Sequence, residues 1–174
     1  MIYPKSLAIL FFYLFTLFLS GCSAQLNKLE TTLPSKQTYA ITQFWNYTQT
    51  PMAGSRAASI VQGVYTAQGV PVVSLIQGSQ NFQEPPSRAD FLNQQKKRAQ
   101  AVDATYLITG EVQEWRYKTG IDGEPVVSYS VEIIHLKDNN VVFRGVGAKS
   151  GWGHKSIGVI AQEIAQELTP NFTP

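Results

Sequence analysis

Cysteine and histidine are scarce in this sequence. The chain of 174 residues contains one cysteine and two histidines. A single cysteine excludes a disulfide framework and a metal site built on cysteine ligands. The two histidines, His135 and His154, fall at the end of a predicted strand and in a glycine-containing loop. We therefore expect no shared metal site and no metal cofactor.

Motifs of the common enzyme classes are missing as well. The sequence has no G-x-S-x-G nucleophile motif, no phosphate-binding P-loop and no dinucleotide-binding fingerprint. Carboxylates that act as an acid/base pair must converge in one pocket. Glu111 and Glu114 would instead project from opposite faces of a regular strand. The sequence therefore predicts a protein that is not an enzyme.

Charge of one sign is not in excess either. The formal net charge is +2, from 14 Lys and Arg against 12 Asp and Glu. Loss of a leader that contains Lys5 would leave 13 basic groups, a net charge of +1. This balance gives no reason to expect nucleic acid as a partner, and the basic run at 96–98 is interpreted as a solvated helix face. Any electrostatic function must come from a local arrangement of charges.

The first 22 residues have the pattern of an exported lipoprotein. An apolar run at 7–19 follows a single cation and is shorter than the ~20 residues needed to cross a bilayer. Residues 19–22 read Leu-Ser-Gly-Cys and resemble a bacterial lipobox. That resemblance implies removal of residues 1–21 and a covalent lipid on Cys22, the only prosthetic group expected. Because Ser23 stands where an acidic retention signal would, it also implies an outer-membrane anchor facing the periplasm.

The remainder predicts a lipidated tether over 22–36 and a single domain over 37–174. The order of elements is β-α-β-α-β-β-β-α, which gives an α/β (α+β) fold with a mixed sheet. The last three strands are expected to form an antiparallel meander with one solvent-exposed face. The predicted elements are a strand at 38–44, a helix from Thr50 to Gly69, a strand at 70–76 buried on both faces, a helix from Ser87 to Val102, strands from Thr105, from Val127 and at 141–148, and a helix from Ser156 to Pro170.

Two loops carry candidate functional residues. The segment TGIDGEP at 119–125 contains Asp122 and Glu124, although carboxylates at a hairpin tip are usually just solvated. The segment KSGWGHKS at 149–156 places Trp152 between glycines and between Lys149 and Lys155. The indole either folds back into the domain or enters a lipid interface, where indole rings and cations are both favoured.

The segments EWRYKTGIDGEP (114–125) and GAKSGWGHKS (147–156) resemble the PelC family, lipoproteins of Pel exopolysaccharide export. The resemblance covers about 38–169. More widely, the element order resembles the TolB N-terminal and curli-secretion group of lipoproteins, a likeness of fold that says little about function.

Resemblance to PelC implies a dodecameric ring beneath an outer-membrane polysaccharide exporter. The ring would carry an acidic funnel for a cationic, partly deacetylated amino-sugar polymer. On this chain it implies that Trp152, with Lys149 and Lys155, contacts the membrane, and that Asp122 or Glu124 lines the funnel. Repetition around a ring would sum the potentials of single carboxylates and the weak membrane contacts of single indoles.

Two other functions belong to the same fold group. A regulator that binds and activates a peptidoglycan synthase would be a monomer on a long disordered tether, whereas the tether expected here has only about 14 residues. A curli-type secretion pore is excluded because the outward strand faces are polar and could not face lipid; these residues are Thr109, Glu111, Gln113, Ser128, Ser130 and Glu132. The ring-forming export lipoprotein is the preferred hypothesis.

Overall fold

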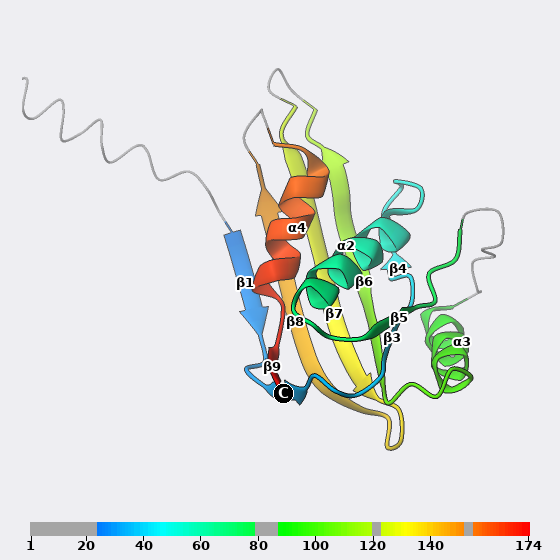
Figure 1. Cartoon of the computed structure of the whole chain (residues 1–174). Helices are drawn as coiled ribbons and strands as arrows, with labels where there is room; N and C mark the ends of the chain where they lie inside the picture. The colour runs from blue at the N-terminus through cyan, green and yellow to red at the C-terminus, as the bar shows by residue number, and fades with distance from the viewer. Residues whose placement is uncertain (1–23, 79–86, 120–122, 152–154) are drawn as a thin grey trace, which may run out of the picture.

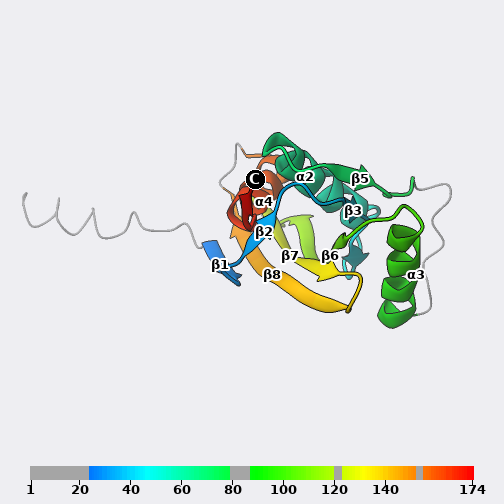
Figure 2. The same cartoon turned by 60° about the horizontal axis from the view of Figure 1, so that its bottom comes forward.

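The computed structural model describes residues 24–78, 87–119, 123–151 and 155–174. Within these residues, seven strands form one mixed sheet in the order β1-β8-β7-β6-β3-β5, with β4 also paired to β6, and β2 pairs with β9. Helices α2 and α4 cover one face of the large sheet, and α3 packs beside β3 and β6 on the other (Figures 1 and 2). The predicted α+β fold with a mixed sheet is confirmed.

The elements have the following bounds. The strands are β1 (Ala24–Lys28), β2 (Thr32–Pro34), β3 (Tyr39–Ile41), β4 (Trp45–Asn46), β5 (Val72–Ser74), β6 (Tyr106–Tyr117), β7 (Pro125–His135), β8 (Asn140–Ser150) and β9 (Asn171–Thr173). The helices are α2 (Ala53–Ala67), α3 (Arg88–Gln100) and α4 (Ile157–Glu167).

The predicted antiparallel meander is confirmed. β6, β7 and β8 pair in sequence, each antiparallel to the next. The turn before β8 contains Asn139 with a φ of 59°, a left-handed conformation that asparagine tolerates. The other edge of β6 pairs with β3, which in turn pairs with β5, and both pairings are parallel. The meander therefore forms the long, rigid part of the sheet that carries both candidate loops.

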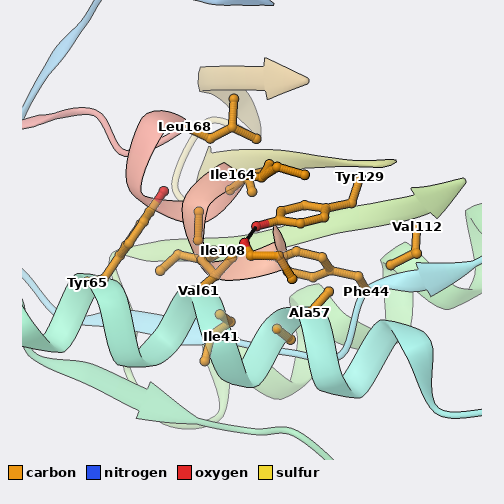
Figure 3. Packing of buried hydrophobic residues seen from close by; sticks show 14 of the residues in the cluster. Ile41, Phe44, Ala57, Val61, Tyr65, Ile108, Val112, Tyr129, Ile164 and Leu168 are labelled. Atoms are coloured by element: carbon orange, nitrogen blue, oxygen red, sulfur yellow. Dashed lines mark hydrogen bonds between the residues drawn. The ribbon is translucent and has the colours of Figure 1, made fainter. Parts of the chain in front are cut away.

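The main core lies between the meander and helices α2 and α4 (Figure 3). Tyr129 on β7 is fully buried, and its hydroxyl donates to the carbonyl of Ala161 on α4 at 2.6 Å. On β8, a Cβ at Gly147 would come within 2.6 Å of the Cγ2 of Ile164. Gly147 therefore allows α4 to pack directly on the strand, which fixes the helix and the loop that precedes it.

Two of the three predicted helix starts are confirmed. The hydroxyl of Ser87 accepts the N–H of Asp90 at 3.1 Å, and Ser156 caps α4 in the same way. The predicted cap at Thr50 is wrong, because α2 begins after Met52, whose φ is 63° and which makes no side-chain cap. The hydroxyl of Thr50 instead donates to the carbonyl of Trp115 at 2.6 Å and ties the loop to β6.

The tether predicted over 22–36 is wrong from Ala24 onward. β1 pairs antiparallel with β8 along its whole length, and β2 pairs parallel with β9 near the C-terminus. Two of the three leucines of this segment make apolar contacts: Leu33 is buried, and Leu26 packs against the main core, whereas Leu29 is exposed. Residues from Ala24 onward therefore belong to the sheet.

Two expectations about strands also need correction. The strand at 70–76 was expected to be buried on both faces, but β5 lies at the edge of the sheet and Val73 is exposed. Glu111 and Glu114 were expected on opposite faces of β6. A β-bulge between Val112 and Glu114 shifts the register, so that both carboxylates lie on the same face, opposite two serines of β7.

Candidate functional site

The described residues that flank the two candidate loops lie next to each other at one end of the meander (Figure 1). Val126 pairs with Ser150 across β7 and β8, and the N–H of Gly151 donates to the carbonyl of Pro125 at 2.9 Å. Glu124, Lys149 and Lys155 therefore belong to one surface, which we call the loop end. Of the other predicted site residues, Cys22, Asp122 and Trp152 lie outside the described residues.

Glu124 closes the hairpin between β6 and β7. Its carboxylate accepts from the Nζ of Lys118 at 2.9 Å, and its carbonyl accepts the N–H of the same lysine at 2.7 Å. The side chain is about one-third exposed. The negative charge that Glu124 could offer to a cationic polymer is therefore countered by a lysine of its own hairpin.

The two lysines expected to contact the membrane are paired with carboxylates of α4. The Nζ of Lys149 lies 2.7 Å from Glu167 and 3.1 Å from Glu163, and the Nζ of Lys155 lies 2.6 Å from Glu163. Hydrogen bonding to Glu167 raises the pKa of Lys149, and the hydrogen bond from Lys155 lowers the pKa of Glu163. We call these four residues the α4 ionic cluster.

The α4 ionic cluster joins both ends of the loop that contains Trp152. Lys149 precedes this loop on β8 and Lys155 follows it, while both carboxylates come from one face of α4. The pairs hold the base of the loop on the helix, and their charges cancel. The sequence analysis missed the partners of these lysines, which are visible as Glu163 and Glu167 at i,i+4 spacing.

A second ionic cluster lies on the face of the meander that was expected to be solvated. Arg88, at the start of α3, bonds Glu111 on β6 and lies 3.8 Å from Glu132 on β7. Arg144 on β8 lies 2.9 Å from the same oxygen of Glu132. The side chain of Glu132 is only 8% exposed, and Thr109 is also buried. This outer-face cluster ties α3 to three strands and is structural in character.

The described residues offer no metal centre. No group of three or more His, Cys, Asp or Glu side chains comes together among them in a way that could hold a metal ion. His135, one of the two histidines, has its Nδ1 2.9 Å from the carboxylate of Asp138 in the turn before β8. In the same part of the chain, no helix is long and apolar enough to span a membrane.

The fold has counterparts in solved structures. The PelC dodecamer from Paraburkholderia phytofirmans is 29% identical, with a TM-score of 0.69, and the match covers 84% of this chain and 95% of that one. A point variant of the same dodecamer is 28% identical to this chain, with a TM-score of 0.68. This chain is a PelC-like protein. No protein-family model and no curated protein sequence matches it.

A more distant likeness supports the fold alone. Lipoprotein GNA1162 from Neisseria meningitidis is 10% identical, with a TM-score of 0.51, and the match covers 75% of this chain and 96% of that one. The match to the PelC dodecamer is higher in both identity and TM-score. The chain is therefore similar to lipoprotein GNA1162 in fold alone, and to PelC in both fold and sequence.

Proposed function

We propose that this PelC-like chain is a lipid-anchored subunit of a periplasmic ring that guides a cationic exopolysaccharide to an outer-membrane exporter. The observation that carries the proposal is the joint likeness of fold and sequence to PelC dodecamers, at 28–29% identity over 84% of the chain. In this proposal Cys22 carries the lipid at the outer membrane, and the protein acts by binding rather than by catalysis. Its partners are other copies of itself, the exporter and the polymer.

We favour Asp122 over Glu124 as the funnel carboxylate because of the contacts that Glu124 makes. Glu124 is held by Lys118, whose ammonium group screens it from an approaching cation. The α4 ionic cluster beside it is balanced, with two lysines and two glutamates. A steering potential at the loop end therefore requires a further carboxylate, and the hairpin sequence supplies Asp122. Copies of one carboxylate around a narrow opening add their potentials and concentrate a polycation.

Oligomeric state is the first test. A chain that begins at residue 23 keeps all of β1 and lacks Cys22, the proposed lipid attachment site. Light scattering of this form should give a closed assembly of about twelve subunits, as in the PelC dodecamer. A monomer at high concentration would contradict the ring and favour the peptidoglycan-synthase regulator. The start of β1 at Ala24 already removes the long tether on which that alternative depends.

The second test addresses the funnel. Asp122→Asn should reduce polymer secretion several-fold while leaving the assembly intact, because it removes one charge from every subunit of the ring. Glu124→Gln should have a smaller effect, since Lys118 already counters that charge. Asp103→Asn is the matched control: its φ of 53° suits asparagine, and it lies before β6, at the opposite end of the strand from the loop end. Unchanged secretion with Asp122→Asn would exclude this carboxylate.

The third test addresses the membrane contact. Trp152→Ala should weaken binding to vesicles of anionic phospholipid without a change in melting temperature. We now assign Lys149 and Lys155 mainly to holding the loop base, because both are paired with α4. A large fall in melting temperature with Trp152→Ala would mean that the indole packs in the domain, and the membrane role would be withdrawn.

A further inference from the structure

The surface of α2 and α4 that faces away from the sheet is poor in charge. Arg56 is the one charged residue in the 15 residues of α2, and the two glutamates of α4 are paired in the α4 ionic cluster. Helix α3, of 13 residues, is the contrast; its charged residues are Arg88, Asp90, Lys96, Lys97 and Arg98. The side of a helix that faces water usually carries charged residues. The composition of α2 therefore suits a helix that is covered on both sides.

A groove of about 420 Å³ lies between α2 and α4 on this surface, and we call it the helix groove. Ile60 and Val64 line it and are half-buried against the main core, while Gln162 and Gln166 line it from α4 and are exposed. No charged side chain is among the described residues that line it. Small-molecule sites are enclosed and contain placed polar groups that orient the ligand. An open, neutral groove of this kind suits another folded surface better.

Gly63 lies in the helix groove, and nothing inside the chain explains why it is glycine. A Cβ at this position would meet no atom of the described chain within 4 Å, whereas a Cβ at Gly54 of the same helix would collide with the carbonyl of Phe44. Glycine in the middle of a helix destabilises it relative to alanine. An exposed glycine that the fold does not require therefore points to close approach of a surface from outside the chain.

A second neutral surface lies on the other side of the sheet, over β1 and β8 (Figure 2). Val146 on β8 is 43% exposed, and its cross-strand neighbours are Asn27 on β1 and Ser130 on β7. Ala148, two residues further along β8, pairs with Gln25. Helix α3 packs elsewhere on this side, next to β3 and β6. We call this uncovered surface the β1–β8 face; its side chains are small or uncharged, so another surface can approach it closely.

The geometry of a ring selects these two surfaces as a pair. The PelC assemblies to which this chain is similar are dodecamers. In a closed ring, each subunit contacts its two neighbours through two different surfaces. With twelve subunits the rotation between neighbours is about 30°, that is 360° divided by twelve, so the two surfaces must lie on nearly opposite sides of the subunit. The helix groove and the β1–β8 face lie on opposite sides of the sheet (Figure 2).

We propose that the helix groove of one copy receives the β1–β8 face of the next copy. Both surfaces are neutral, so their contact buries no unpaired charge. Val146 supplies apolar area for the groove, and the exposed amides on both surfaces can donate and accept hydrogen bonds. The inference rests on the proposed function for the ring, and it adds which parts of the chain join the subunits.

The test uses two variants of the full chain in detergent, with subunits counted by native mass spectrometry. Gly63→Arg blocks the helix groove, and Val146→Arg blocks the β1–β8 face; each variant alone should be a monomer. An equal mixture should give a dimer with one copy of each variant and nothing larger, because only one intact groove and one intact face can meet. Full-size assembly of either variant, or a mixture that stays monomeric, would overturn the proposal.

Two further arginine substitutions are the matched controls. Val73→Arg replaces a valine that is 38% exposed on the edge strand β5, and Gln94→Arg changes an exposed position of α3. Both should leave the assembly intact, because neither lies on the two proposed surfaces. If Val73→Arg gave monomers, copies would be joined through the edges of the sheet rather than through its two sides, and the proposal would be wrong.

Gly63→Ala separates a contact between copies from a role inside the fold. In the monomeric Val146→Arg background it should raise the melting temperature, because alanine is the better helix former and its Cβ has free space. In the otherwise unmodified chain it should weaken assembly by about tenfold on dilution, because the added methyl group obstructs close approach. Assembly as strong as that of the unmodified chain would remove Gly63 from the contact.

Failure of this inference is distinguishable from failure of the proposed function. An unmodified chain that is a monomer would refute the ring itself. An unmodified chain that assembles, together with variants that assemble equally well, would refute the two surfaces and leave the ring. Loss of polymer secretion by Gly63→Arg with an intact assembly would mean that the helix groove binds a different partner, which also contradicts the proposal.

Discussion

The two faces of the β6-β7-β8 meander are built on different principles. The inner face is closed by shape: Gly145 and Gly147 follow Phe143 on β8, and α4 lies directly on the strand. The outer face is closed in part by charge: beside the apolar contacts of Leu107 and Ile134 with α3, Arg88 and Arg144 lie over carboxylates that would otherwise face water. The comparison shows that alternation of apolar and polar residues along a strand identifies its two faces. It does not show that the polar face is exposed to solvent.

The largest effect is expected on the inner face. Gly147→Val would place a branched side chain where a Cβ alone comes within 2.6 Å of Ile164. Because this contact must be relieved by moving α4, we expect a loss of about 2–3 kcal/mol in the free energy of unfolding. Urea unfolding measures this loss, as a shift of the transition midpoint to lower urea concentration.

The next residue of the strand provides the control for this substitution. Val146 points to the outer face and is 43% exposed. Val146→Ile adds bulk to the same strand and should change stability by less than about 0.5 kcal/mol. Equal losses for the two variants would mean that the faces are not packed differently.

A smaller effect is expected on the outer face. Glu132→Ala removes a nearly buried carboxylate that faces Arg88 and Arg144. Since both arginines can turn toward water, we expect a loss of about 1–2 kcal/mol rather than the full penalty of an isolated buried charge. Glu114→Ala is the control, because this exposed carboxylate bonds only Arg116 among the described residues, and it should cost less than about 0.5 kcal/mol. Urea unfolding of the two variants, Glu132→Ala and Glu114→Ala, measures the difference between their losses of stability.

Local signals in the sequence predicted most of the fold. The caps at Ser87 and Ser156 depend on residues three positions away, and the meander depends on runs with a period of two. The errors occurred where a distant partner decides the structure. Residues 24–28 are polar enough to resemble a spacer, and become a strand only because β8, over a hundred residues later, offers an open edge. A bulge such as that after Val112 leaves no clear mark in the sequence.

The role of the candidate site stays a prediction. Motifs at 114–125 and 147–156 directed attention to the loop end, and the structure brings Glu124, Lys149 and Lys155 together there. The pairing of the two lysines with Glu163 and Glu167 could not be read from the loops themselves, because it depends on the orientation of α4.

The smallest effect is expected where neither face of the sheet closes over the charges, in the α4 ionic cluster. Lys155 lowers the pKa of Glu163, so this carboxylate stabilises the fold above the unfolded value of about 4.3 and loses that contribution as the pH falls through its lower folded value. Glu163→Gln should cost about 0.5–1 kcal/mol at pH 7. The difference in free energy of unfolding from the unmodified chain should shrink as the pH falls below the unfolded pKa, as measured by urea unfolding at pH 7 and at acid pH.

The control for this last substitution is Glu30→Gln, whose carboxylate is largely exposed and lies 3.8 Å from Lys28. It should leave stability unchanged at both pH values. If Glu163→Gln behaved in the same way, the pairs with Lys149 and Lys155 would not be holding the base of the Trp152 loop. The lysines would then be available for phospholipid after all, and the membrane-contacting role expected from the sequence would return to them.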